Sequence, residues 1–149
     1  MTDSATTVHV YCDGACSPNP GRGGWGAVIR SGGRDREIAG AERETTNNRM
    51  ELTAAVAALR SLPEHSRVVV VTDSKYLADC FRQGWMDKWR KNGWQTAARA
   101  PVKNKDLWVI LDEQVRRHTV TWQWIGGHTG HPENERADQL AVTARMRLP

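Results

Sequence analysis

The sequence predicts a single α/β domain with a mixed β-sheet. Two patterns support this: segments in which apolar and polar residues alternate, typical of strands, and segments in which apolar residues recur at helical spacing. Their order is strand, strand, strand, helix, strand, helices, strand, helix. A length of 149 residues with 39% hydrophobic residues suits one buried core. No repeat or linker divides the chain, so we expect residues 1–149 to form one domain.

The first third of the chain is predicted to form an antiparallel meander. Residues 8–12 alternate between the two sides of a strand, and the glycines and prolines of residues 14–24 are expected to end it. Residues 25–31 and 36–41 are typical of two further strands, joined by a turn at Gly32-Gly33. A hairpin should therefore follow the first strand.

A change to helical spacing predicts a helix over residues 50–62. Asn47 and Asn48 precede this helix and can cap its start, and Pro63 stops it. The run of four valines at 68–71 has no polar face, which is typical of a strand covered on both sides. Such a strand belongs in the interior of a mixed or parallel sheet.

Helices and one more strand complete the chain, and the glycine-rich loop IGGHTGHPENE precedes the final helix. In order, we expect a helix over residues 73–81, short helical pieces over 84–94, a helix over about 103–117, a strand over 120–124 and a helix over 134–147.

The positive charge is concentrated in one segment. The net charge is +4, but residues 82–105 contain seven lysines and arginines against the single acid Asp87, a local charge of +6. The rest of the chain is therefore mildly acidic, at −2. A basic segment on an acidic body indicates an anion-binding arm beside a metal-binding or catalytic centre.

Other features narrow the class of protein. The first residues, MTDSATT, show no basic stretch before an apolar run, and no apolar segment of membrane-spanning length occurs, so neither secretion nor membrane insertion is predicted. We expect a cytoplasmic protein. The three cysteines, Cys12, Cys16 and Cys80, form no metal-finger pattern and are expected to be reduced packing residues.

Four acidic residues lie where they could converge. Asp13 ends the first strand, Glu51 lies in the first turn of a helix, Asp73 ends the buried strand and Asp138 lies on the last helix. Four carboxylates brought together repel strongly unless cations neutralise them, and oxygen ligands favour hard divalent ions such as Mg²⁺. Two such ions about 4 Å apart support phosphodiester hydrolysis.

Each acid also has an ordinary structural explanation. Asp13 suits a turn, Asp73 suits a helix cap, Glu51 suits the positive end of a helix dipole, and Asp138 could be an exposed helix residue. From these residues alone, the structural and the catalytic interpretations both stay open.

Four longer segments resemble a known family. YCDGACSPNPGRGGWGAVI, TTNNRMELTAAVAAL, VVTDSKYL and GHTGHPENERADQLA resemble, in order and spacing, the signature blocks of bacterial type 1 ribonuclease H. The second and fourth segments are unusually specific, and the resemblance extends over nearly the whole chain. It implies the family fold, a five-stranded mixed sheet flanked by helices, which agrees with the element order predicted above.

The resemblance implies a nuclease that cuts the RNA strand of RNA–DNA hybrids. Asp13, Glu51, Asp73 and Asp138 match the family's active-site carboxylates, with two Mg²⁺ ions, or Mn²⁺ as a substitute, and products with 5′-phosphate and 3′-hydroxyl ends. His128 matches the family's mobile-loop histidine, which is thought to help the product leave or to handle a proton. Without the resemblance, a histidine among glycines is usually just exposed to solvent.

The resemblance also implies contacts with both strands of a hybrid. Residues of two segments match the family's strand-contacting loops: Gly14, Cys16, Asn19, Thr46, Asn47 and Asn48. For the asparagines, turn and cap roles remain alternatives. Glu44 stands where family members often carry a basic residue near a DNA phosphate pocket, so phosphate attraction would be weaker unless Arg43 or Arg49 reaches in.

The basic segment, residues 82–105, resembles the family's basic protrusion, which we call the handle. Aromatic and basic residues alternate in it and are expected to bind the DNA strand: Trp85, Lys88, Trp89, Arg90, Lys91 and Trp94. Tryptophans at helical spacing also pack against one another, and both roles can hold.

Two other classes of function are considered. A hybrid-binding module without catalysis would keep the handle but lose a carboxylate, whereas all four acids are present. A junction resolvase or another nuclease of the same fold is the second alternative, because fold does not determine substrate. TTNNRMEL and the handle favour the hybrid-cleaving branch, and the family resemblance favours a monomer.

Overall fold

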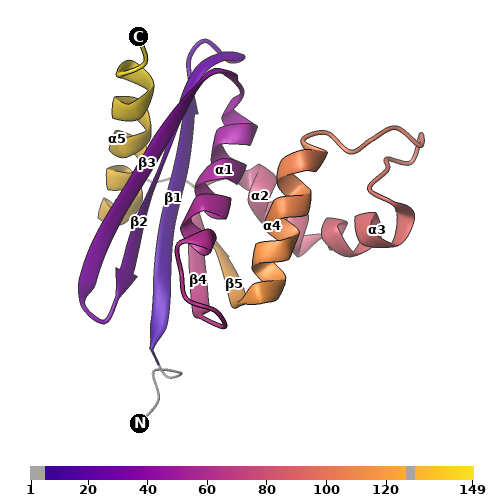
Figure 1. The fold of residues 1–149 in the computed structure, drawn as a ribbon, viewed down its shortest axis with the longest axis horizontal. Coiled ribbons are helices and arrows are strands. Elements are labelled where there is room, and N and C mark those ends of the chain that lie inside the picture. The colour runs from indigo at the N-terminus through magenta and orange to yellow at the C-terminus, as the bar shows by residue number, and fades with distance from the viewer. Residues whose placement is uncertain (1–5, 127–129) are drawn as a thin grey trace.

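The protein folds around one five-stranded mixed sheet, as expected from the sequence (Figure 1). The structure is a computed structural model and describes residues 6–126 and 130–149. The elements follow the predicted order: β1 (Thr7–Cys16), β2 (Gly21–Ser31), β3 (Arg34–Thr45), α1 (Asn47–Arg60), β4 (Arg67–Thr72), α2 (Lys75–Arg82), α3 (Trp85–Asn92), α4 (Lys105–Arg117), β5 (Thr119–Trp124) and α5 (Pro132–Met146).

The sheet has the order β3-β2-β1-β4-β5. The first three strands form the predicted antiparallel meander, while β4 pairs in parallel with both β1 and β5. The valine-rich strand β4 is thus interior, as its sequence predicted. Because β1 and β4 are parallel neighbours, their carboxyl ends lie at the same edge of the sheet.

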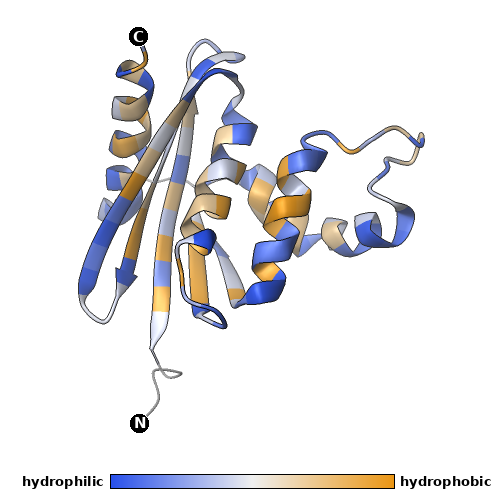
Figure 2. Ribbon diagram, in the orientation of Figure 1, coloured by the Kyte–Doolittle hydropathy of each residue, from blue (hydrophilic) through white to orange (hydrophobic). Residues whose placement is uncertain are grey.

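Helices cover the sheet on two faces. Helix α5 packs on β2 and β1, whereas α1 lies across the other face and packs against α4 (Figure 1). The main core lies between the sheet and these helices, where Val10, Val70, Leu52, Leu59 and Trp108 are fully buried. Hydrophobic residues run along α1 and α4, while α3 and the hairpin end of β3 are mainly hydrophilic (Figure 2).

The glycine-rich segment after Asp13 does not end the first strand, contrary to prediction. Strand β1 continues to Cys16, and β2 begins at Gly21 rather than at residue 25. A β-carbon on Gly24 would overlap the carbonyl oxygen of Ala141 in α5. Glycine in β2 therefore permits close approach of a helix, and its turn-forming tendency is overridden by tertiary packing.

Helix α1 begins earlier than predicted. Its cap is Thr46 and not the predicted Asn47 or Asn48. Oγ1 of Thr46 accepts a hydrogen bond from the backbone N–H of Arg49 at 3.1 Å. The asparagines lie in the first turn and are exposed. Glu51 is consequently one turn further in and buried, so the helix-dipole interpretation of this acid is wrong.

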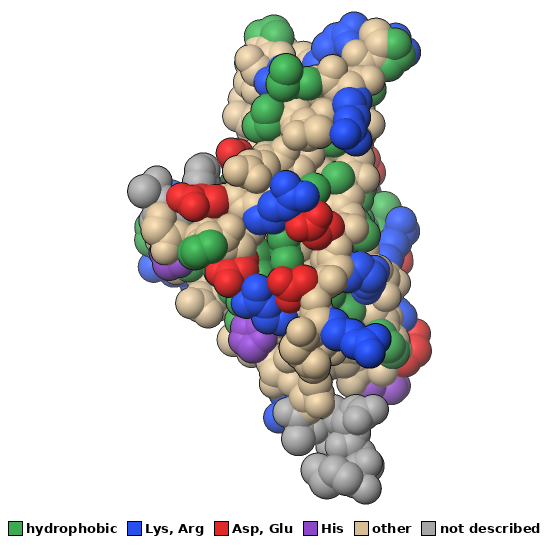
Figure 3. All heavy atoms as spheres, turned by 90° about the vertical axis from the view of Figure 1, so that its left-hand side faces the viewer, with side chains coloured by type: hydrophobic (Ala, Val, Ile, Leu, Met, Phe, Trp, Pro, Cys, Tyr) green, Lys and Arg blue, Asp and Glu red, His purple; other side chains and the backbone are tan. Residues whose placement is uncertain are grey.

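Strand β3 is also longer than the predicted 36–41. It forms an edge of the sheet, and its exposed polar residues carry no apolar periodicity. On this side of the molecule, acidic and basic side chains are interleaved (Figure 3). Arg136 of α5 pairs with Glu37 at 2.7 Å, and Arg30 of β2 pairs with both Asp35 and Glu133. These pairs join α5 to the hairpin of β2 and β3.

Two further predictions concern the class of protein. Among the described residues, no helix has the length and apolar character needed to cross a membrane. The cysteines are free thiols, and Cys12 and Cys80 are buried packing residues as expected, whereas Cys16 is only half-buried.

A buried histidine makes stability depend on pH. The Nδ1 of His118 accepts a hydrogen bond from the backbone N–H of Ser66 at 3.1 Å, and its Nε2 lies 3.0 Å from the carbonyl oxygen of Leu59. Burial lowers the pKa of His118. The folded state therefore favours neutral imidazole, and this stability is present above the ordinary histidine pKa and lost as pH falls below it.

We expect the thermal unfolding midpoint to fall between pH 7 and pH 5 more steeply in the wild type than in His118→Asn, which does not titrate. Circular dichroism melts at several pH values measure this. Parallel pH profiles for the two proteins would contradict the assignment.

Candidate active site

Three predicted carboxylates meet at one edge of the sheet. Asp13 lies on β1, Asp73 directly follows the parallel strand β4, and Glu51 comes from α1. Each offers an oxygen atom, and these three atoms lie within 4.8 Å of one another. Asp13 and Glu51 are buried, at 5% and 9% exposure, and Asp73 is partly buried. The sheet topology thus brings together residues that are far apart in the sequence.

Gly14 makes this convergence possible. A β-carbon at this position would lie 2.6 Å from the backbone nitrogen of Glu51 and 2.7 Å from the carbonyl carbon of Met50. Only glycine lets α1 approach β1 so closely without displacement. The backbone N–H of Gly14 also donates to Oδ1 of Asp13 at 2.9 Å, which helps to orient that carboxylate.

Asp138 completes the predicted set from the opposite layer. It is half-buried on α5, and its side chain is near enough to Asp13 to raise the pKa of that carboxyl. The interpretation of Asp138 as merely an exposed helix residue is therefore wrong.

The cluster strongly resists ionisation when no cation is bound. Burial, followed by the charge of Asp73 and the hydrogen bond to Asp138, raises the pKa of Asp13 to about 8. Burial, followed by the charges of Asp13 and Asp73, also raises the pKa of Glu51. In addition, Oε1 of Glu51 is buried without a hydrogen-bond partner among the described residues. A divalent cation would relieve both the repulsion and the unsatisfied oxygen.

Four of the six predicted strand-contacting residues also converge, whereas Gly14 and Cys16 lie on β1 outside their hollow. Asn19, Thr46, Asn47 and Asn48 line a polar hollow of about 340 Å³ together with Pro20, Lys103 and Asn104. The amino ends of α1 and α4 border this hollow, and the positive end of a helix dipole favours anions. Asn19 also has a structural role, because its Oδ1 accepts the backbone N–H of Asn47 at 3.2 Å.

The cation of this hollow is Lys103 and not Arg49. Arg49 forms two hydrogen bonds with Asp106, at 2.9 and 2.8 Å, so its charge is already neutralised. Lys103 lines the hollow and is exposed, whereas Glu44 is exposed and is not one of the residues that line the hollow. Lys103 therefore supplies the positive charge that family members often place at the position of Glu44.

The handle projects from the sheet as helix α3 and the loop that follows it (Figure 1). Its tryptophans pack in a chain: Trp85 lies 5.9 Å from Trp89, and Trp89 lies 5.8 Å from Trp94 and 5.4 Å from Trp108 of α4, between ring centres. All three handle tryptophans are half-buried. The packing role considered from the sequence is confirmed, and each ring keeps some accessible surface.

The three handle cations are not equivalent. Nε of Arg90 lies 3.0 Å from the carboxylate of Asp112, whose side chain is only 8% exposed, and Arg90 also pairs with Asp87. Arg90 therefore fastens the handle to α4. Lys88 and Lys91, by contrast, are exposed and lie on α3 facing solvent.

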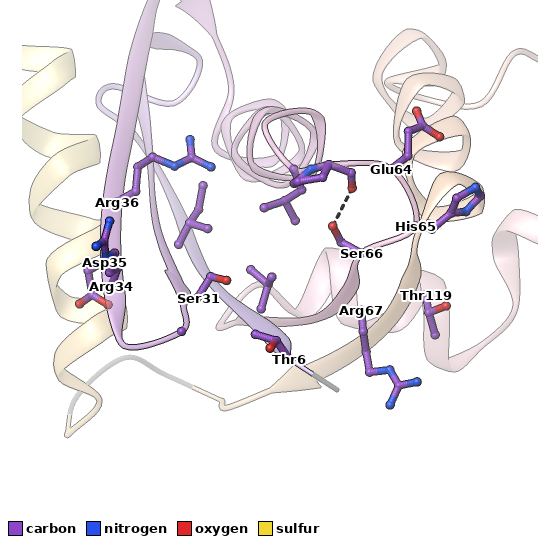
Figure 4. Close-up of a pocket in the computed structure, with 15 residues that line it drawn as sticks. Thr6, Ser31, Arg34, Asp35, Arg36, Glu64, His65, Ser66, Arg67 and Thr119 are labelled. Atoms are coloured by element: carbon purple, nitrogen blue, oxygen red, sulfur yellow. Dashed lines mark hydrogen bonds between the residues drawn. The ribbon is translucent and has the colours of Figure 1, made fainter. Parts of the chain in front are cut away.

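A larger hollow of about 1020 Å³ lies at the other end of the sheet (Figure 4). It is lined by the start of β1, the hairpin between β2 and β3, and the connection from α1 to β4, including Arg34, Arg36 and Arg67. It contains none of the predicted site residues. Size alone therefore does not identify the candidate active site.

One predicted site residue is not described by the structure, and two residues at or near the site were not predicted from the sequence. His128 lies outside the described residues, so its predicted role stays a prediction. Asn104 of the hollow and the buried Asn134 of α5 were not singled out from the sequence. Asn134 stands inside the specific segment GHTGHPENERADQLA, a signal that could have identified it.

A mixed sheet in the order found here, with carboxylates at the shared edge of β1 and β4, defines the class of ribonuclease H folds. The profile of the family described as RNase H matches residues 5–146. The chain therefore belongs to the ribonuclease H family.

Curated relatives agree with this assignment over most of the chain. A ribonuclease H of Pseudomonas entomophila is 57% identical over 141 residues, covering 95% of this chain and 93% of the relative. A ribonuclease HI of Brucella melitensis is 58% identical over 134 residues, covering 90% of this chain and 86% of the relative. The resemblance to bacterial type 1 ribonuclease H is thereby confirmed.

Solved structures share the fold. LC9-RNase H1, a type 1 RNase H with the type 2 active-site motif, is 36% identical with a TM-score of 0.82, covering 94% of this chain and 72% of that one. LC11-RNase H1, solved with an RNA/DNA hybrid, has a TM-score of 0.63 over 94% of this chain and 97% of its own, but is only 24% identical. The second likeness shows the fold alone.

Proposed function

We propose that this protein is a magnesium-dependent endoribonuclease that hydrolyses the RNA strand of RNA–DNA hybrids. The observation that carries the proposal is the convergence of Asp13, Glu51 and Asp73, each of which offers an oxygen atom within 4.8 Å of the others, with Asp138 close to Asp13. The chain has this cluster, the substrate-facing hollow and the handle, and its curated relatives are ribonucleases H.

The four carboxylates suit Mg²⁺, with Mn²⁺ as a substitute. All the donors are oxygen atoms, which hard cations prefer, and the unpartnered Oε1 of Glu51 is available as a ligand. Asp13, Glu51, Asp73 and Asp138 would hold two ions. When bound, the ions supply an activated water and stabilise the departing oxygen, which leaves 5′-phosphate and 3′-hydroxyl ends.

The remaining residues position the hybrid. Gly14 and Cys16 lie on β1 beside the carboxylates and would contact the RNA strand. The hollow formed by Asn19, Thr46, Asn47 and Asn48 offers amide and hydroxyl groups, with Lys103, to a phosphate of the DNA strand. The handle contributes Lys88 and Lys91 together with the accessible surfaces of Trp85, Trp89 and Trp94.

Cleavage of strand-labelled substrates tests the proposal. Hybrid, duplex RNA, duplex DNA and a branched DNA junction are incubated with the protein, with Mg²⁺ or with a chelator, and analysed on denaturing gels. We expect cutting of the hybrid's RNA strand only, and only with Mg²⁺. Binding without cutting would favour the non-catalytic module, and cutting of the junction alone would favour a resolvase.

A variant pair separates the binding and anchoring roles in the handle. In Lys88→Ala/Lys91→Ala, hybrid binding should weaken and should depend less on salt. The negative slope of log affinity against log salt concentration should become shallower by about 2, because each phosphate contact contributes about 1 to its magnitude. In Arg90→Ala, the buried carboxylate of Asp112 loses its partner, so unfolding free energy should fall by about 1–3 kcal/mol.

Filter binding at several salt concentrations and urea denaturation measure these effects. An unchanged salt slope in the double lysine variant would remove the handle from the binding surface. Unchanged stability of Arg90→Ala would remove its anchoring role.

Further properties belong to the same proposal. Residues 1–149 act as one catalytic domain and as a monomer, which light scattering of the purified protein tests.

His128 acts at product release or proton handling, so His128→Ala should slow turnover without ending it. A complete loss of turnover would give His128 a larger role than proposed.

A further inference from the structure

A buried asparagine on α5 has no role in the mechanism above. Asn134 is 1% exposed, and it is the most deeply buried polar side chain of its helix. It precedes Asp138 by four residues, so both side chains lie on the same face of α5, towards the sheet. This places an amide one helical turn from an acid of the candidate active site.

The amide connects α5 to the strand that carries Asp73. Nδ2 of Asn134 donates to the carbonyl oxygen of Val71 at 3.3 Å, and Val71 lies on β4, two residues before Asp73. Helix α5 packs mainly on β2 and β1. The hydrogen bond therefore adds a polar link between α5, which carries Asp138, and β4, which directly precedes Asp73.

The other end of the amide is unsatisfied. Oδ1 of Asn134 is buried and has no hydrogen-bond partner among the described residues. A buried acceptor without a donor destabilises the fold, and such a group is normally satisfied by water or a ligand. A leucine of similar volume would fill the space without this cost, so packing alone does not account for the amide.

We propose that Asn134 is a positioning residue for the carboxylate cluster. Its Nδ2 holds α5 against β4, so that Asp138 and Asp73 keep a constant separation. Its buried Oδ1 would accept a hydrogen bond from a water molecule when the carboxylates hold a metal ion. This inference rests on the proposed function, because it concerns metal binding by the same carboxylates.

Metal-dependent stabilisation tests the inference without measuring activity. Mg²⁺ that binds only the folded protein raises the thermal unfolding midpoint in proportion to site occupancy. In Asn134→Leu, we expect the Mg²⁺ concentration for half-maximal stabilisation to rise by about tenfold or more, the usual effect of losing a group that orients metal ligands. Asn134→Ser, which leaves room for water to restore the link, should show a smaller rise.

Leu140→Ala is the matched control. Leu140 lies on the same helix and packs against Gly26 of β2, away from β4. This change should lower the midpoint measured in chelator while leaving the half-maximal Mg²⁺ concentration as in the wild type. If Asn134→Leu behaves like this control, Asn134 is only structural and the inference is wrong; if Asn134→Leu does not fold, Asn134→Ser decides in the same way.

The wild type separates this inference from the proposed function. If Mg²⁺ stabilises the wild type and both Asn134 variants at equal concentrations, only the positioning role fails. If Mg²⁺ does not stabilise the wild type, the proposed metal-dependent function fails, and the role of Asn134 fails with it.

Discussion

Replacing Asp13 by asparagine is expected to abolish cleavage while leaving hybrid binding largely intact. The substitution keeps the shape of the side chain but removes a charged oxygen ligand at the centre of the cluster. Turnover should fall by at least about a hundredfold, because loss of a ligand exceeds the 10–100-fold cost of disturbing a ligand's partners. The hollow and the handle are unchanged, so hybrid affinity measured by filter binding should stay close to that of the wild type.

Asp35→Asn is the matched control for this variant. Asp35 pairs with Arg30 near the hairpin of β2 and β3, far along the sheet from the cluster, and its loss should leave turnover unchanged. If Asp13→Asn retains turnover within a few-fold of the wild type, the metal-binding role of Asp13 is wrong.

The Asp13→Asn variant should also be more stable than the wild type when metal is removed. The pKa of Asp13 rises from 3.8 to about 8 in the folded protein, so the folded state retains a proton that the unfolded chain releases. The stability from this protonated carboxyl is complete below pH 4 and is lost as pH rises towards 8. Asparagine never ionises and avoids the loss.

In chelator, the unfolding midpoint of Asp13→Asn should therefore exceed that of the wild type by several degrees at pH 8, since about 1 kcal/mol corresponds to about 2–4 °C at this chain length. The difference should shrink as the pH is lowered to 5. A difference independent of pH would mean that carboxylate repulsion is not its cause.

Gly14→Ala is expected to weaken both stability and metal binding. The new β-carbon would overlap the backbone of Met50 and Glu51, which belongs to a buried helix and cannot rotate away. Helix α1 must shift from β1, at a cost of about 1–3 kcal/mol for an overpacked core. Because Glu51 moves with the helix, the carboxylates separate, and stabilisation by Mg²⁺ should need a higher concentration.

Gly32→Ala provides the comparison. Gly32 lies in the hairpin turn with φ +58, where a β-carbon meets no atom within 4 Å. Its replacement costs about 1–2 kcal/mol from backbone strain alone. Thermal melts with increasing Mg²⁺ should show a normal metal response in Gly32→Ala and a weakened one in Gly14→Ala. Equal responses in both variants would show that Gly14 does not control the position of Glu51.

Local pattern was most informative where one kind of residue dominates a segment. The valines of β4 predicted an interior strand, because a strand that is covered on both faces is apolar at every position. The alternation of residues 8–12 predicted β1, because successive side chains of a strand point to opposite faces. Prediction failed where glycines lie inside β2, since a glycine that admits α5 has the same sequence signal as a glycine in a turn.

The candidate site shows the same division. The four acids could be chosen because the resemblance marked them, whereas their residue types alone also suited turns and caps. The sequence could not indicate that Arg49 is neutralised by Asp106, or that Arg90 is held by Asp112. Those partners are 57 and 22 residues away in the chain, and such pairs are visible only after folding.

The sequence by itself determined the order of the elements, because this depends on local spacing, and it determined the family, because the chain contains its signature blocks. The resemblance in turn marked the four carboxylates and the basic handle as candidates. The tertiary structure alone decided which groups share a site. It placed Glu51 against Gly14, gave the polar hollow its cation in Lys103, and buried Asn134 between α5 and β4. Contacts of this kind arise from the parallel pairing of β1 with β4 and the packing of helices on both faces, which local sequence patterns do not encode.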